Sequence, residues 1–248
     1  MTIPRKGWRA VKTALLAFAC LFTLAPAGFA DGTGFLSAQA DAYAHYREAV
    51  FYTRTGNTAV AGLALDEFVI KWAALVAKYA DSPPAQYAGD GSWRDTLQEI
   101  MKRAETGLDA LDVDDPEAAR DAIDPIRGIL GDLRRRSNVV TYSDHVNALG
   151  AAMDVLARYR KEVKDLGDAT AVAMVREQAA IVEALFEKCR DQAAREVATD
   201  PEFKRLVDGA AESMGKLLES LETGDLLLYR IGIGELRSYE RIMFLRFG

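Results

Sequence analysis

Apolar residues along this chain recur mostly at spacings of three and four, which is the periodicity of amphipathic α-helices. After residue 30, the first such stripe follows Ala38, Ala42, His45, Ala49 and Tyr52. A later stripe follows His145, Leu149, Met153, Leu156 and Val163. No segment shows a convincing apolar–polar alternation of the kind found in half-buried strands. The pattern therefore predicts an all-α protein of about eight helices.

Short breaks interrupt the helical pattern at similar intervals. Four of them end one helical pattern with a Gly or Asp and cap the next: Gly56-Asn57, Asp114-Asp115, Gly167-Asp168 and Gly224-Asp225. Helices joined by such short turns run antiparallel. We therefore predict four antiparallel helical hairpins, packed either as a helical bundle or as a short α-solenoid.

The second helices of these hairpins share a pattern of apolar positions. Three of them carry an apolar residue four, eight and eleven positions after the cap: Ala61, Leu65, Phe68; Ala119, Ile123, Ile126; and Tyr229, Ile233, Leu236. The remaining helix breaks the pattern at Arg176. An internal repeat is one interpretation. The other is that any helical chain of this length needs turns at such intervals, where Gly and Asp are common.

Several helix starts can be read from the sequence. Asp115-Pro116-Glu117 and Asp200-Pro201-Glu202 each place a capping Asp before a Pro at the first helical position. Thr141-x-x-Asp144 and Ser92-x-x-Asp95 resemble capping boxes with Asp in place of Glu. Pro125 lies inside the helix that Pro116 opens, so we expect it to kink or split that helix.

The first thirty residues have the layout of a secretory signal peptide. Four basic residues precede an uncharged apolar run, and Gly28-Phe29-Ala30 offers small residues at a cleavage site. We expect cleavage near Ala30 and a periplasmic or secreted mature protein, with an uncleaved anchor as the alternative. The mature chain, 31–248, contains no further membrane segment and is interpreted as one helical domain, with possible halves at 31–137 and 138–248.

Charge and cysteine content limit the partners. Without the four basic residues of the signal segment, 27 Lys and Arg face 37 Asp and Glu, a net charge of −10. This balance disfavours nucleic acid and anionic lipid as partners. Cleavage removes Cys20 and leaves Cys189 alone, so we expect no internal disulfide. Cys189 is interpreted as a small part-buried apolar residue, with an intermolecular disulfide as the alternative.

Residues 44–68, AHYREAVFYTRTGNTAVAGLALDEF, resemble a tetratricopeptide-like helical hairpin. Ala49, Tyr52, Ala61 and Leu65 fall where that family places a small residue, an aromatic, a small residue and a large apolar one. The family's Trp-x-x-Leu opening and closing Pro are missing, and the other hairpins lack its 34-residue period. The resemblance implies helix pairs that present one face to another protein.

Most catalytic signatures are absent from the sequence, which contains no P-loop, no Gly-x-Ser-x-Gly elbow and no Cys-x-x-Cys-His. The two histidines, His45 and His145, both lie on predicted apolar stripes. His145 follows a helix start, where the helix dipole favours the neutral ring that binds metals. His45 and Glu48 form a His-x-x-Glu pair on one helix face, and this pair resembles a short motif of imelysin-like exported helical proteins. His45, Glu48 and His145 are therefore candidate metal ligands, with core packing as the alternative for each histidine.

Aromatic residues near a long loop and at the C-terminus are candidates for partner binding. Trp93 directly follows the loop 82–92, and Tyr239, Phe244 and Phe247 lie in an arginine-rich last helix. Packing of these residues inside the protein is the alternative. We expect a non-enzymatic adaptor or accessory factor that binds another periplasmic protein or itself and needs no cofactor. The alternative is a bundle that binds a transition metal or a non-covalent b-type haem through His45 or His145.

Overall fold

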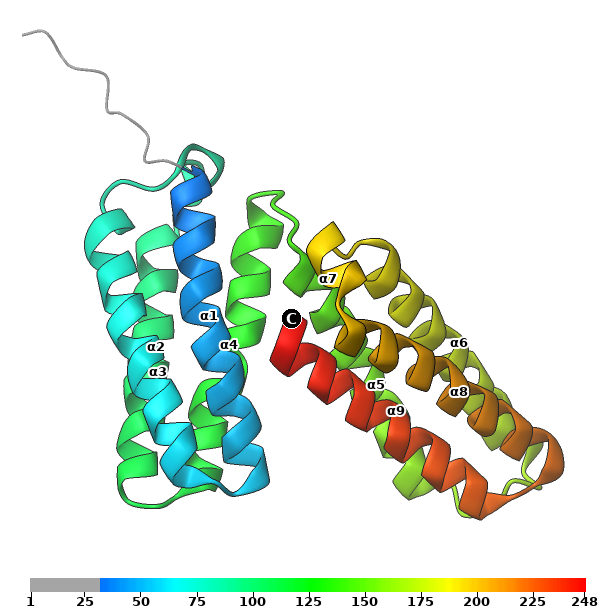
Figure 1. Ribbon diagram of the computed structural model, residues 1–248. Coiled ribbons are helices and arrows are strands. Elements are labelled where there is room, and N and C mark those ends of the chain that lie inside the picture. Colours follow the sequence, from blue (N-terminus) through cyan, green and yellow to red (C-terminus); the bar gives the residue numbers. More distant parts are fainter. Residues whose placement is uncertain (1–31) are drawn as a thin grey trace, which may run out of the picture.

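The computed structural model describes residues 32–248, so the signal segment and its cleavage site lie outside the described residues. The described chain is all-α, as predicted, and contains no β-strand (Figure 1). Nine α-helices and one short 3-10 helix occur in this range, in the order α1 Gly32–Thr55, α2 Thr58–Tyr79, η1 Ala85–Tyr87, α3 Trp93–Asp112, α4 Pro116–Arg136, α5 Tyr142–Glu162, α6 Ala169–Asp191, α7 Arg195–Thr199, α8 Pro201–Thr223 and α9 Leu226–Phe247. The five-residue α7 and the three-residue η1 are the elements that the sequence pattern did not predict.

The four predicted hairpin turns are confirmed. They join α1 to α2, α3 to α4, α5 to α6 and α8 to α9. The second residue of each turn, Asn57, Asp115, Asp168 or Asp225, accepts a hydrogen bond from a backbone N–H of the following helix. Gly56 and Gly224 adopt φ angles of 81° and 73°, a left-handed conformation that glycine reaches without a Cβ clash. Local turn chemistry therefore fixes where each hairpin folds back.

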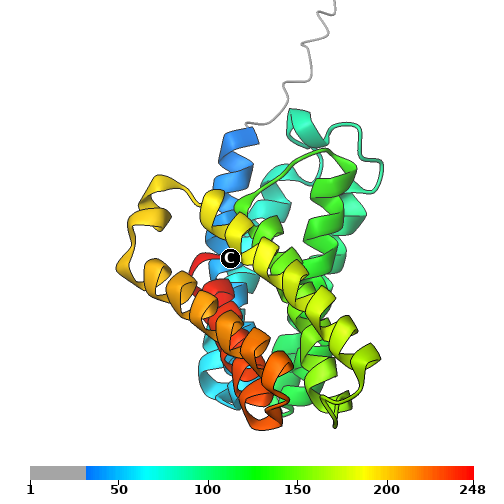
Figure 2. The ribbon, with the colours of Figure 1, turned by 90° about the vertical axis from the view of Figure 1, so that its right-hand side faces the viewer.

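The hairpins close into two four-helix bundles. In the first, α1 packs on α2, α2 on α3, α3 on α4, and α4 returns against α1. In the second, the same ring runs through α5, α6, α8 and α9, and α9 returns against α5. Figure 1 shows the two bundles side by side, joined by the segment between α4 and α5, and Figure 2 shows them from the side of the second bundle, which lies in front of the first. Because each ring is closed, the first and last helices of a bundle cover one another's apolar faces, which an open solenoid would leave exposed.

The apolar positions predicted for the return helices lie in the core. All nine residues of the shared pattern in α2, α4 and α9 are fully buried. The helix α6 departs from the pattern, as the sequence indicated, and buries Val175, Ala179 and Val182 while Arg176 is exposed. The buried apolar side chains form one connected cluster through both bundles.

The stripe predicted for α1 is right in part. Ala42 and Ala49 are fully buried, whereas His45 and Tyr52 are only partly buried and Ala38 is exposed. Phe35, Tyr43 and Tyr46, which the stripe left out, fill the rest of the core face. Large aromatic side chains remove far more apolar area from water than alanine does, and they therefore decide which face turns inward. Of the two effects expected of Pro125, the split does not occur, because α4 runs from Pro116 to Arg136 without interruption, and the kink stays a prediction.

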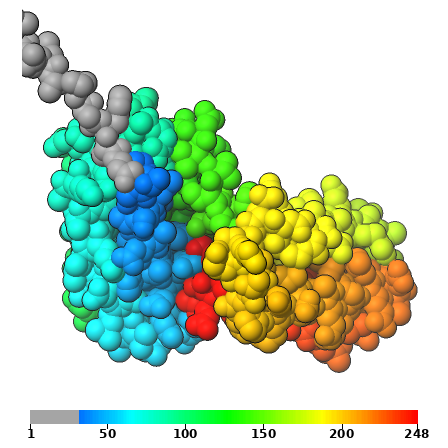
Figure 3. Space-filling view, turned by 45° about the horizontal axis from the view of Figure 1, so that its top comes forward, coloured from blue at the N-terminus to red at the C-terminus, as the bar shows by residue number. Residues whose placement is uncertain are grey.

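The C-terminal end of α9 connects the two bundles. It packs against α1, and Figure 3 shows this end lying between the first bundle and the segment around α7. Tyr43 of α1 meets the ring of Phe244 edge-on at a centroid distance of 6.4 Å. Arg47 donates hydrogen bonds to the carbonyl oxygens of Phe244 and Gly248. Between residues 32 and 248, no helix combines the length and the apolar character needed to cross a bilayer.

Candidate functional site

The three candidate metal ligands lie on the flanks of their helices. His45 and His145 are both partly buried, and Glu48 is exposed. The buried face of α5 begins one residue after His145, with Val146, and continues through Leu149. Burial lowers the pKa of His145, the positive charge of Lys188 lowers it further, and Asp144 opposes both. The neutral ring is thus favoured at this position, as expected, but burial and Lys188 are the causes.

No cluster of three or more His, Cys, Asp and Glu side chains suited to a metal ion occurs in the described part of the chain. His45 belongs to the first bundle and His145 to the second, since α1 and α5 lie in different rings. A metal or haem site at His45, Glu48 or His145 stays a prediction.

The predicted partner-binding aromatics take part in internal packing. Trp93 is 3 % exposed and Phe244 is 5 % exposed, so neither side chain is available as a surface anchor in this conformation. Trp93 packs against Phe35 and Tyr87, and its indole N–H donates to the carbonyl of Tyr79 at 2.9 Å. These contacts fasten the loop between α2 and α3 to the core. These rings lie inside because removing a large aromatic surface from water contributes a favourable free energy to folding.

Tyr239 and Phe247 are half-buried. The ring of Phe247 meets Phe203 of α8 edge-on at 5.3 Å. Tyr239 lies against α8, with its ring 2.4 Å from where a Cβ on Gly209 would be. Their role in partner binding stays a prediction.

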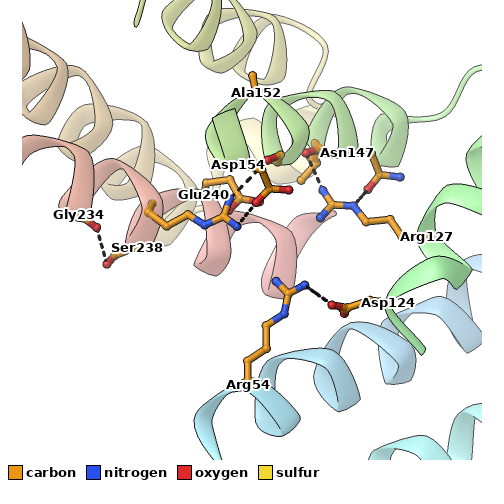
Figure 4. A network of polar contacts seen from close by, with 12 residues as sticks. Arg54, Asp124, Arg127, Asn147, Ala152, Asp154, Gly234, Ser238 and Glu240 are labelled. Carbon is orange, nitrogen blue, oxygen red and sulfur yellow. Dashed lines mark hydrogen bonds and ion pairs between the residues drawn. The ribbon is translucent and has the colours of Figure 1, made fainter. Parts of the chain in front are cut away.

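A polar network lies where the two bundles meet (Figure 4). Arg127 of α4 donates hydrogen bonds to Asn147 and to the carbonyl of Val146, both on α5. Its guanidinium carbon lies 4.3 Å from the ring centre of Phe244, a cation–π contact with α9. One arginine thus contacts both helices of the second bundle that face the first. These contacts hold the two bundles together, and they give Arg127 a structural role that requires no bound ligand.

The same network contains a buried carboxyl group. Glu240 of α9 is 2 % exposed, and its Oε2 lies 3.2 Å from Nη1 of Arg237. Arg237 also pairs with Asp154 of α5. Burial raises the pKa of Glu240 above its ordinary value, although the charges of Arg237 and Arg127 act in the opposite direction. A buried carboxyl with a raised pKa is often a functional group, but Glu240 already has a partner in Arg237 of its own helix.

The outward side of α2 exposes more apolar than charged side chains, although Glu67 and Lys78 are exposed there as well as Asp66. Ala59, Leu63, Asp66, Ile70, Ala74 and Ala77 are all exposed and follow helical spacing; we call these six residues the α2 face. Leu63 is 72 % exposed and Ile70 is 55 % exposed, and Asp66 is the single charge among the six. An exposed helix face normally carries charged and polar residues. Apolar residues gathered in this way are typical of a surface that binds another protein.

A groove extends from the α2 face toward α3. It has a volume of 550 Å³ and is lined by Gly62 and Leu63 of α2 and by Leu108 and Leu111 of α3. Asp66, Asp112 and Asp114 also line it and make it acidic. The hydroxyl of Thr58 donates to Asp114 at 2.7 Å and ties the start of α2 to the turn before α4.

The turn beside this groove exposes a further apolar side chain. Val113, the residue before Asp114, is 75 % exposed. Apolar surface therefore continues from the α2 face to the turn between α3 and α4. Together, the α2 face, the groove and Val113 form the candidate functional site.

Reasoning from the sequence missed this surface. A signal was present, because 58–79 is almost uniformly apolar and contains only four charged residues, Asp66, Glu67, Lys71 and Lys78. A helix that is apolar on all sides is either fully buried or exposes apolar surface. Only the packing of α2 at the outside of a four-helix ring shows which of the two applies.

Comparisons of the chain with protein-family models, with curated proteins and with solved structures return no match.

Proposed function

We propose that this chain is an exported, non-enzymatic protein that acts as an adaptor or accessory factor and binds another protein through the α2 face. The observation that carries the proposal is the exposure of Leu63 and Ile70 on an otherwise well-packed helix. Burying a large aliphatic side chain contributes about 1.5–3 kcal/mol, so two such anchors supply a useful share of a binding energy. The layout of residues 1–30 supports export to the periplasm.

The chemistry of the surface indicates the kind of partner. An apolar line on a helix, next to a groove, is complementary to an amphipathic helix that inserts its own apolar residues. The carboxylates of Asp66, Asp112 and Asp114 along this groove favour Lys or Arg on the polar side of that helix. The partner is therefore a protein with a basic amphipathic helix.

The test uses a photo-crosslinking amino acid in place of Leu63, in the full chain expressed with its own signal segment. We expect one distinct adduct, heavier than the protein by the mass of the partner, and its loss when Asp66 and Asp112 are both changed to Lys. The matched control places the same amino acid at Lys204, an exposed position on α8. Equal adducts at both positions, or none at position 63, would refute the proposal. An adduct of twice the protein's own mass would show that the partner is a second copy.

A further inference from the structure

A second groove lies in the other bundle, between α5 and α9. It has a volume of 430 Å³, within the size range of small-molecule sites. Five cationic side chains line it: Arg158, Arg160, Lys161, Arg237 and Arg241. We call these five residues the basic groove. Asp154 is the single acidic residue in its lining.

Only Arg237 forms ion pairs among the five cations. It pairs with Asp154 and Glu240, as described above. Within residues 32–248, no carboxylate forms an ion pair with Arg158, Arg160, Lys161 or Arg241, although the charges of Glu240 and Asp154 also act on Arg241. The five cations therefore outnumber these two carboxylates in a chain whose net charge is −6. Such a local excess focuses positive potential in a concave site and attracts anions.

The pKa of Arg241 reflects both its burial and the charges around it. Burial lowers the pKa of Arg241, the positive charges of Arg237 in the groove and of Arg54 outside it lower it further, and Glu240 and Asp154 oppose this. Arg237 and Arg241 are thus like charges that line the same groove. An anion between these two arginines would relieve the repulsion between them.

Part of the groove is fixed in advance. The Nε of Arg160 donates to the carbonyl of Arg230 at 2.8 Å, which anchors this guanidinium on α9. Its Nη2 would lie only 3.6 Å from a Cβ on Gly234, so the missing side chain of Gly234 leaves the wall open beside it. Ser238 also lines the groove, and its hydroxyl donates to the carbonyl of Gly234 at 3.0 Å (Figure 4). A guanidinium that is already ordered loses little side-chain entropy when it binds a ligand.

From these observations, we propose that the basic groove binds a small multivalent phosphate anion, such as a pyrophosphate or a phosphate ester. Guanidinium groups match phosphate oxygens with paired hydrogen bonds, and three of the four cations without an ion pair are arginines. Nucleic acid fits poorly, because the acidic surface elsewhere repels a long polyanion. The site is independent of the α2 face, which lies on the other bundle.

The proposal is tested by titration calorimetry of the mature chain with inorganic pyrophosphate at physiological ionic strength. We expect saturable binding with one pyrophosphate per chain. The double variant Arg158→Gln/Lys161→Gln should weaken it by about ten-fold or more, since each charge-assisted hydrogen bond is worth at least that factor. Both side chains are exposed, so the variant keeps the fold.

The matched control, Lys102→Gln/Lys204→Gln, removes the same charge from exposed lysines outside the groove and should bind pyrophosphate like the unaltered chain. A second arm replaces pyrophosphate by vesicles of phosphatidylglycerol, with phosphatidylcholine vesicles for comparison. Vesicle binding that requires Arg158 and Lys161 identifies a lipid headgroup as the phosphate source, and pyrophosphate binding alone identifies a free phosphate compound. Absence of binding in both arms, or an equal loss in the control variant, overturns the proposal.

Discussion

Arg134 and Asp144 form a buried ion pair that joins the end of α4 to the start of α5. The guanidinium donates from Nε to both carboxylate oxygens at 2.9 Å and from Nη2 to Oδ1 at 2.6 Å. Arg134 is 2 % exposed, while a quarter of the Asp144 side chain remains accessible. Asp144 also accepts from the backbone N–H of Thr141 at 2.8 Å. One carboxylate thus caps α5 and at the same time fixes the direction in which the second bundle leaves the first.

The two partners of this pair should respond differently to substitution. Asp144→Asn leaves a buried, unpaired guanidinium and should lower the free energy of unfolding by about 3 kcal/mol. Arg134→Met should cost less, because it removes the buried charge, and the remaining carboxylate reaches water and still caps α5. Urea denaturation of both variants and of the double variant measures these differences.

Asp95→Asn is the matched control, because Asp95 stands at the same place after its helix start, is exposed and has no buried arginine beside it. Its effect should stay within about 0.5 kcal/mol, as for most surface changes. An equal loss in Asp95→Asn and Asp144→Asn would contradict the importance assigned to the buried pair.

Glu240 should make the stability of the protein depend on pH. Burial raises its folded-state pKa above the ordinary 4.5, so between 4.5 and the folded-state value the folded protein binds more protons than the unfolded chain. Stability from this group is present at pH 4.5 and below, and is lost as the pH rises through that window. Glu240→Gln should therefore become progressively more stable than the unaltered protein as the pH rises to neutral. Urea denaturation of both proteins at a series of pH values measures the difference.

Glu235, on the same helix, provides a control of opposite sign. A hydrogen bond from Ser213 lowers its pKa, burial opposes this, and a further hydrogen bond from Lys216 adds to the lowering. Glu235 therefore stabilises the folded protein above pH 4.5. This stabilisation is lost as the pH falls through the folded-state pKa of Glu235. Glu235→Gln should lose stability relative to the unaltered protein as the pH rises through this lower window. The same slope for both variants would show that the assignment at Glu240 is wrong.

Gly232 permits the close approach of α8 and α9. A Cβ at this position would lie 3.0 Å from the backbone N of Leu217 and 3.1 Å from the backbone O of Ser213. Neither atom can move without shifting α8, so Gly232→Ala should destabilise the protein by about 2 kcal/mol despite alanine's higher helix propensity. Gly215→Ala, also at a helical glycine but with no atom within 4 Å, should instead stabilise it by about 1 kcal/mol. Thermal unfolding distinguishes the two, and equal effects would contradict the crossing described.

Cys189 should be unreactive in the folded protein. Its side chain is fully buried, and burial together with the charge of Glu240 raises the pKa of the thiol to about 12, against a smaller opposing effect of Lys188. The thiolate is the reactive form, so a chromogenic thiol reagent should not label the folded mature chain. The same reagent should titrate one thiol in urea, where the side chain is accessible. Rapid labelling without urea, or a disulfide-linked dimer, would contradict this expectation.

Much of the architecture could be predicted because it is encoded locally. A capping Asn or Asp accepts hydrogen bonds from the free N–H groups of its own helix, whatever the tertiary contacts of that helix are. The turns of the hairpins can therefore be located from four local residues: Asn57, Asp115, Asp168 and Asp225. Apolar spacing likewise identified the buried faces of α2, α4 and α9. The face of α1 was predicted only in part, because only packing shows that Phe35, Tyr43 and Tyr46 fill the core together with Ala42 and Ala49.

The candidate sites could not be predicted in this way. The basic groove combines Arg158 and Lys161 with Arg241, which is about eighty residues further along the chain, and no short motif connects them. The buried ion pair of Arg134 could not be predicted either. Arg134 belongs to a run of three arginines at a helix end, where the helix dipole alone accounts for positive charge.

The sequence by itself determined the helices, their caps and their turns, because these depend on interactions between residues a few positions apart. It also indicated the layout of a signal segment. The tertiary structure alone decided that the hairpins close into two rings, that Glu240 is buried, and that Leu63 and Ile70 face water. These outcomes depend on which helices become neighbours, and that choice is set by side-chain packing between segments far apart in the chain.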